Sequence, residues 1–216
     1  MTCSMGEAKR MPHNTCVEII DAVVVGEYPR HGLFVESVNR ISGMLLAGMG
    51  PMPVGKRLSI HGLTSGSEMS MYEIVSAVDG DPLAPLGVTS LSLGPKPIDP
   101  ETSQGLDMTG ILVKLVGKVT AVDTEQRIMY LDDGGTLRLD GASARGIKVY
   151  IPEGMDIPEE HSVVAVTGVG MREEASLAEQ VKIGQRIYPA GTPVTTTSIV
   201  CREAADITTF SLPNGP

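Results

Sequence analysis

The stretch from Ile111 to Val122, ILVKLVGKVTAV, decides the fold. β-Branched and other apolar residues dominate it, which is typical of a strand rather than a helix. It is long for a strand, and Gly117, between Leu115 and Val119, allows a bend near its middle. A long strand that curls in this way is expected as the first strand of a small β-barrel.

Shorter apolar runs follow this stretch, separated by turn residues such as Asp133-Gly134-Gly135 and Pro152-Glu153-Gly154. A similar series precedes it in the N-terminal half. Many short strands with regular turn signals predict an all-β sandwich or barrel. The predicted strands are Val17–Val25, Leu33–Glu36, Met44–Ala47 and Arg57–His61 in the first half, and Ile111–Val122, Ile128–Leu131, Ile147–Ile151 and Ser162–Thr167 in the second.

The two halves repeat one pattern. In each half, a long strand and a turn lead to an aromatic residue followed two positions later by an acid, in Phe34–Glu36 and again in Tyr130–Asp132. A glycine then opens the next run, at Gly43 and at Gly146. This order predicts two tandem five-stranded OB-fold-like Greek-key barrels with extended terminal segments. In the first half, Asp21 occupies the place of the central glycine, so either the alignment is off by one residue or that barrel bends differently.

The composition between these strands suggests the domain boundaries. Leu93–Pro100 contains three prolines in eight residues, which is typical of a stiff linker. The predicted parts are an N-terminal segment (1–16), a first barrel (17–92), a Pro-rich linker (93–108), a second barrel (109–191) and an extended C-terminal tail (192–216).

Charge excludes several partners. The chain's 216 residues carry 17 basic and 26 acidic side chains, a net charge of −9, which disfavours nucleic acid and anionic membrane surfaces. No apolar run is long enough for a membrane-spanning helix. Met1–Glu7 lacks the basic and apolar regions of a signal peptide, so the protein is expected to be cytosolic or to have its leader outside this sequence. Cys3 and Cys16 either form a bridge or remain free thiols.

Several motifs resemble a known group of domains. Gly6–Lys9, Gly32–Glu36 and Asn39–Met44 resemble the G-E-A-K, F-Y-V-E and D-R-S-S-G-I motifs of the paired OB-like domains in large secreted or surface bacterial proteins. Thr109–Thr120 and Tyr130–Gly134 are similar to the N-T-G-L-L-V-R-V-x-G-x-V-T and Y-V-D-D-G motifs of their second domain. The resemblance covers roughly residues 5–190, with Asn and Ile replacing Asp and Ser in the third motif. It implies the fold and an extracellular or cell-surface origin, but no catalytic residues.

Phe34 and Tyr130 are the candidate ligand residues. Both lie on the second strand of a predicted barrel, where OB-folds that bind nucleic acid place stacking aromatic rings. Core packing is the simpler interpretation, and stacking against a base or a sugar is the alternative. Acids follow both rings, which disfavours a base but not a sugar.

No motif predicts catalysis, a cofactor or a metal. Gly50–Arg57 approaches a phosphate-binding loop, but Arg57 replaces the required hydroxyl residue and prolines remove backbone donors. Asp132, Asp133 and Asp140 fit turns better than a calcium loop. The four histidines have no partner at catalytic spacing.

The predicted tail supplies the leading functional hypothesis. Its β-branched runs are expected to pair with a sheet edge of another subunit, as in head-to-tail filaments. We therefore expect a non-enzymatic structural protein, extracellular, whose partner is a second copy of itself. The alternative is a module that binds a glycan or another surface ligand, and binding of single-stranded nucleic acid is less favoured. The candidate self-association residues are Val194, Ile199, Val200, Ile207, Phe210 and Leu212.

Overall fold

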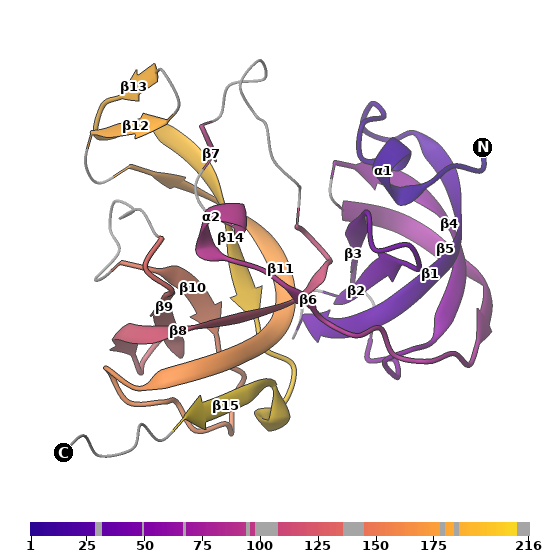
Figure 1. Ribbon diagram of the computed structural model, residues 1–216. Helices are drawn as coiled ribbons and strands as arrows, with labels where there is room; N and C mark the ends of the chain where they lie inside the picture. Colours follow the sequence, from indigo (N-terminus) through magenta and orange to yellow (C-terminus); the bar gives the residue numbers. More distant parts are fainter. Residues whose placement is uncertain are drawn as a thin grey trace. The chain divides into compact units, whose positions relative to one another are not determined.

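The computed structural model describes residues 1–28, 32–48, 50–66, 68–93, 96–97, 108–135, 145–177, 180–183 and 186–210. The chain divides into two compact units (Figure 1). The first contains Met1–Leu86 and Met108–Leu112, and the second contains Gly87–Asp107 and Val113–Pro216. Both are built mainly from strands, so the all-β prediction is confirmed. Among the described residues, none of the helices has the length and apolarity needed to cross a bilayer.

The first unit is a closed barrel of five strands in the order β1-β2-β3-β5-β4. All neighbours are antiparallel except β3 and β5, which run parallel. The closed barrel of five strands agrees with the fold class predicted from the sequence. A short helix, α1 (Met5–Ala8), precedes the barrel and begins at a capping box formed by Ser4 and Glu7. The strands are β1 (Cys16–Tyr28), β2 (Gly32–Ser37), β3 (Gly43–Ala47), β4 (Arg57–Ser65) and β5 (Glu68–Val78).

Asp21 explains how β1 bends without a central glycine. Its φ is 63°, and the pairing of β1 with β4 shifts register between Ile19 and Ala22, on either side of it. Asp tolerates this left-handed conformation better than most residues, so a bulge at Asp21 turns the strand. Of the two alternatives drawn from the sequence, the second is therefore correct: the alignment holds, and the first barrel bends differently. Side chains from all five strands fill the interior, including Val17, Ile19, Val24, Leu33, Val35, Met44, Leu46, Leu58, Ile60 and Met69.

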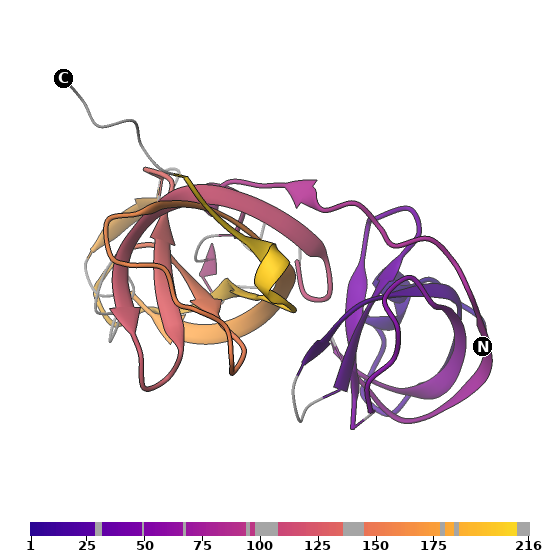
Figure 2. The same cartoon turned by 90° about the horizontal axis from the view of Figure 1, so that it is seen from below.

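The second unit repeats this order. Its strands run β8-β9-β10-β14-β11, and pairing of β11 with β8 closes the ring. Here β10 and β14 are the parallel pair. Figure 2 shows the strands of each unit curling around an interior. These strands are β8 (Leu112–Asp123), β9 (Ile128–Asp132), β10 (Ile147–Tyr150), β11 (Val163–Ser176) and β14 (Pro193–Val200).

The remaining elements are additions to this second ring, and most of them pair with its strands. β6 (Leu86–Gly87) pairs with β8, β7 (Lys96–Pro97) pairs with β14, and α2 (Ser90–Leu93) lies between them in sequence. A hairpin of β12 (Val181–Ile183) and β13 (Arg186–Tyr188) separates β11 from β14. After the short η1 helix (Ala204–Asp206), β15 (Ile207–Phe210) pairs with the first half of β11.

Two predicted boundaries are wrong. The predicted tail contains β14, which is the fifth strand of the second barrel and lies between β10 and β11. The predicted linker also begins inside the second unit, because α2 and β7 belong to it, whereas 98–107 lie outside the described residues. The N-terminal segment is not free either: Thr2 forms a bridge with Glu18, and Met5 and Ala8 pack into the first core.

Candidate functional site

The strongest candidate site is the outer face of the second barrel across β9, β10 and β11. Alternation along β9 points Met129 and Leu131 inward, where both are fully buried, and leaves Tyr130 half-buried on the outside. Tyr130 pairs across the strands with Lys148 of β10. We call the set of Tyr130, Lys148, Tyr150 and Glu173 the Tyr130 face.

Charge and hydrogen bonding organise this face. Lys148 Nζ lies 3.0 Å from Glu173 Oε2 and 5.5 Å from the centre of the Tyr150 ring. The Tyr150 hydroxyl donates to the other oxygen of Glu173. The Lys148 and Glu173 side chains remain 30% and 17% exposed. The face therefore combines aromatic rings with a mutually neutralised ion pair, all half-buried rather than enclosed.

The equivalent positions in the first barrel are apolar and buried. Phe34 pairs with Leu45 exactly where Tyr130 pairs with Lys148, yet Phe34 is 0% and Leu45 8% exposed. Phe34 alternates along β2 with Leu33 and Val35, which belong to the barrel core, so it lies on the opposite, outer face and is buried there. Its burial disfavours the predicted role as a ligand platform, because the ring does not reach solvent in this structure. Tyr130 remains accessible.

A backbone segment covers the outer face of the first barrel next to Phe34. The N–H of Leu112 donates to Glu36 Oε2 at 2.9 Å, and Arg40 Nη2 donates to the carbonyl of Leu112 at 2.9 Å. Arg40 Nε also lies 2.7 Å from Glu36 Oε1. Lys9 Nζ donates to the Thr109 carbonyl at 3.3 Å. Burial raises the pKa of Glu36, although the Leu112 N–H and Arg40 act in the opposite direction.

Two glycines allow the backbones to touch. A Cβ atom on Gly43 would lie 2.3 Å from the Gly110 carbonyl, and one on Gly110 would lie 2.3 Å from the Met44 nitrogen. Gly110 also has a φ of +77°. We call Lys9, Glu36, Arg40 and Gly43 the Glu36 cradle, and Met108–Leu112 the docked segment. Four of the motifs that carry the family resemblance contribute to this one contact, which gives them a structural role.

The predicted self-association residues fall into two groups. Val194, Ile199 and Val200 are at most 2% exposed in β14, so they build their own barrel and are not free for another subunit. Ile207 and Phe210 lie on β15, one of the two end strands in the described part of its sheet, and Phe210 is 45% exposed. Leu212 lies outside the described residues.

The other candidates have structural surroundings. Asp133 accepts bonds from the N–H and hydroxyl of Ser90; its pKa is lowered because these bonds and that of Gly135 outweigh burial. Asp132 accepts from Gly134 N–H in a turn, and Asp140 lies outside the described residues. Gly50–Arg57 leads into β4 rather than into a helix. In the described part of the chain, no three His, Cys, Asp or Glu side chains are grouped as metal ligands.

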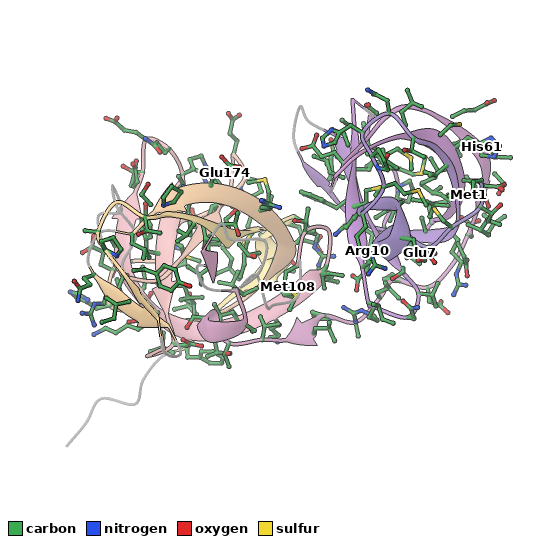
Figure 3. All side chains as sticks on the ribbon, turned by 90° about the horizontal axis from the view of Figure 1, so that it is seen from above. Met1, Glu7, Arg10, His61, Met108 and Glu174 are labelled. Carbon is green, nitrogen blue, oxygen red and sulfur yellow. The ribbon has the colours of Figure 1, made fainter. Side chains whose placement is uncertain are left out.

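The thiols and histidines add no site. Cys3, Cys16 and Cys201 are free thiols, so the bridge between Cys3 and Cys16 is not formed. His61 Nε2 lies 3.3 Å from Glu18 Oε1, and the same carboxylate accepts from Thr2. Figure 3 shows Met1 and His61 on one side of the first barrel, with Glu7 and Arg10 at α1. This cluster fastens the N-terminal segment to β1.

Sequence reasoning missed Lys148, Tyr150 and Glu173. Alternation in Ile147-Lys148-Val149-Tyr150 places Lys148 and Tyr150 on one face, and that signal was available. Glu173 reaches them only because β14 lies between β10 and β11.

Comparison with family models, with curated proteins and with solved structures finds no match for this chain. The evidence for the fold is therefore the strand order and register of the structure.

Proposed function

We propose that this protein is a non-enzymatic binding module whose Tyr130 face holds an uncharged glycan. One observation carries the proposal: the two barrels share a register, but only the second presents aromatic and hydrogen-bonding groups at the positions paired as Tyr130 and Lys148. OB-folds bind oligosaccharides and oligonucleotides on this part of the barrel, along the second and third strands.

The chemistry of the face favours a sugar over a nucleic acid. A tyrosine ring offers a flat apolar surface to the C–H groups of a sugar, and its hydroxyl offers a hydrogen bond. Lys148 and Glu173 already neutralise one another, so a ligand phosphate would compete with Glu173 for the ammonium group. The net charge of −9 opposes a polyanion further.

Titration of the full chain with neutral cello-, chito- and manno-oligosaccharides, followed by amide NMR shifts, tests this proposal. We expect the largest shifts at Tyr130, Lys148 and Tyr150. Tyr130→Ala should weaken binding by about fivefold, because one aromatic contact contributes about 1 kcal/mol. Phe210→Ala, which removes an exposed ring on β15, is the control and should bind like wild type.

Two results would refute the proposal. One is that no oligosaccharide of this panel binds, and the other is that Tyr130→Ala and Phe210→Ala bind equally well. We extend the proposal to an extracellular or cell-surface location on the basis of the motif resemblance alone. Fractionation of the source cells tests that part separately.

A further inference from the structure

The docked segment has an unusual place in the chain. Met108–Leu112 belongs to the first unit, yet the residues on both sides of it, Gly87–Asp107 and Val113 onward, belong to the second. Its three apolar side chains, Met108, Ile111 and Leu112, are at most 5% exposed. The first unit is therefore built from two stretches of chain that are separate in sequence, Met1–Leu86 and Met108–Leu112.

The Glu36 cradle recognises this segment mainly through its backbone. Glu36 accepts a hydrogen bond from the N–H of Leu112, and Arg40 donates one to the carbonyl of the same residue. Lys9 donates to the carbonyl of Thr109. These contacts are charge-assisted, which makes them stronger than bonds between neutral groups. They join residues that are 72 to 100 positions apart in sequence. Nothing in their geometry requires both partners to come from one chain.

The connector that leads out of the first barrel has no regular secondary structure. Residues 81–85 form neither helix nor strand, and most of their side chains are exposed. Arg40 Nη1 donates to the Ala84 carbonyl, which joins the cradle to the connector. If the connector beyond Pro82, which packs near Gly55, turned toward a neighbouring molecule, the contacts to Thr109 and Leu112 could form between two copies and the bond to Ala84 would be lost.

We propose that two copies of this chain exchange their docked segments, so that the Met108–Leu112 segment of each copy fills the Glu36 cradle of the other. The resulting dimer is reciprocal, because each molecule donates one segment and accepts one. Its interface reproduces contacts that the monomer already makes, so the exchange costs little apart from the association itself. This self-association is independent of the glycan proposal and does not involve the predicted tail.

Concentration is the first test. The full chain is unfolded and then refolded at low concentration and at about 1 mM. At about 1 mM the concentration of segments from other molecules approaches the effective concentration of the segment in the same chain. Size-exclusion chromatography with light scattering then measures the dimer. We expect a monomer from the dilute sample and a persistent dimer from the concentrated one. A protein that is monomeric in both samples overturns the proposal.

Paired variants provide the second test. Gly110→Ala disables the donated segment, because its Cβ would meet the Met44 backbone. Gly48→Ala is the matched control: Gly48 has a similar φ of +81°, but nothing lies within 4 Å of the added Cβ. The dimer fraction should fall by about tenfold or more in Gly110→Ala and stay near that of wild type in Gly48→Ala. Equal dimer fractions in the two variants overturn the proposal.

Mixing supplies the most specific result. The double variant Glu36→Gln/Arg40→Ala keeps its segment but lacks a working cradle and leaves no buried charge behind. Neither this variant nor Gly110→Ala should dimerise alone, whereas refolding them together should give a heterodimer with one intact contact. Absence of a heterodimer from two variants that circular dichroism shows to be folded contradicts the exchange. If either variant fails to fold, the concentration test on wild type decides alone.

Discussion

Among single residues, Glu36 has the most unusual electrostatic position. Its carboxylate is completely buried, and Leu112 N–H and Arg40 are its hydrogen-bond partners. Burial raises its pKa above the ordinary value of 4.5, so the folded protein holds this proton more tightly than the unfolded chain. The contribution of Glu36 to the free energy of unfolding must then fall as the pH rises through that window.

We therefore expect a defined pH dependence for Glu36→Gln. The difference in free energy of unfolding between wild type and the variant should move against wild type from about pH 4.5 upward, and level off once Glu36 is ionised in both states. Urea denaturation at a series of pH values measures it. A difference that favours wild type with rising pH would contradict the direction of this pKa shift.

Cysteine reactivity gives a second prediction at this scale. Burial, with a smaller effect from Asp206, raises the pKa of Cys201 to about 12, whereas the Cys16 side chain is exposed. Because the thiolate is the reactive form, Cys201 should not react with a disulfide reagent at pH 8 until the protein unfolds. Cys16 should react at once. Counting released chromophore before and after adding denaturant measures both, and immediate reaction of all three thiols would disprove it.

At the scale of elements, β1 and β8 both shift register near the middle, β1 around Asp21 and β8 between Val119 and Ala121, but they differ in the residue at the matching position. β8 has Gly117, where a Cβ would lie 2.8 Å from the Asp132 carbonyl oxygen of β9. β1 instead has the bulge at Asp21. The sequence identified the glycine and left the aspartate open, because a bulge depends on the register of two strands rather than on the residue alone.

Substitution at Asp21 should reveal the strain of this bulge. Asp21→Val should lower the free energy of unfolding by about 1–2 kcal/mol, because a β-branched side chain fits a left-handed backbone poorly. Asp21→Gly should be neutral or slightly stabilising. The ion pair with Arg57, at 3.3 Å, lies at the surface, so Asp21→Asn isolates its small contribution. Chemical denaturation of the three variants tests the ranking, and a valine variant as stable as the glycine variant would refute it.

The connections between strands explain which elements the sequence did not predict. Sequence reasoning recovered the tandem barrels because the long strands and the aromatic-to-acid pattern recur in both halves. It located neither fifth strand: β5 (Glu68–Val78) was not predicted, and β14 was assigned to the tail because the hairpin of β12 and β13 separates it from β11. It could not separate Phe34 from Tyr130, because the segment that covers the neighbouring Glu36 and Gly43 comes from far along the chain.

For the whole molecule, the position of β14 predicts the result of a truncation. A chain that ends at residue 192 should lose the second barrel, since β14 buries Val194, Ile199 and Val200, each worth roughly 1.5–3 kcal/mol. Their sum approaches the total stability of a typical domain. Hydrogen exchange should show loss of protection in β10 and β11, whereas a chain that ends at Phe210 should keep it. Protected amides in those strands of the shorter chain would contradict the topology.

The shared register of the two barrels also has a consequence for how this chain can change by mutation. Positions 34 and 45 lie on the outer face of their barrel but are buried, so new side chains there must fit against the groups that cover them, while the equivalent positions 130 and 148 are half-buried and can change without altering the barrel interior. Mutations on the outer face of the second barrel can therefore change its binding surface, while the first barrel and both interiors stay the same. A combinatorial library randomised at 130, 148 and 150 is accordingly a natural starting point for selecting new specificities on this scaffold.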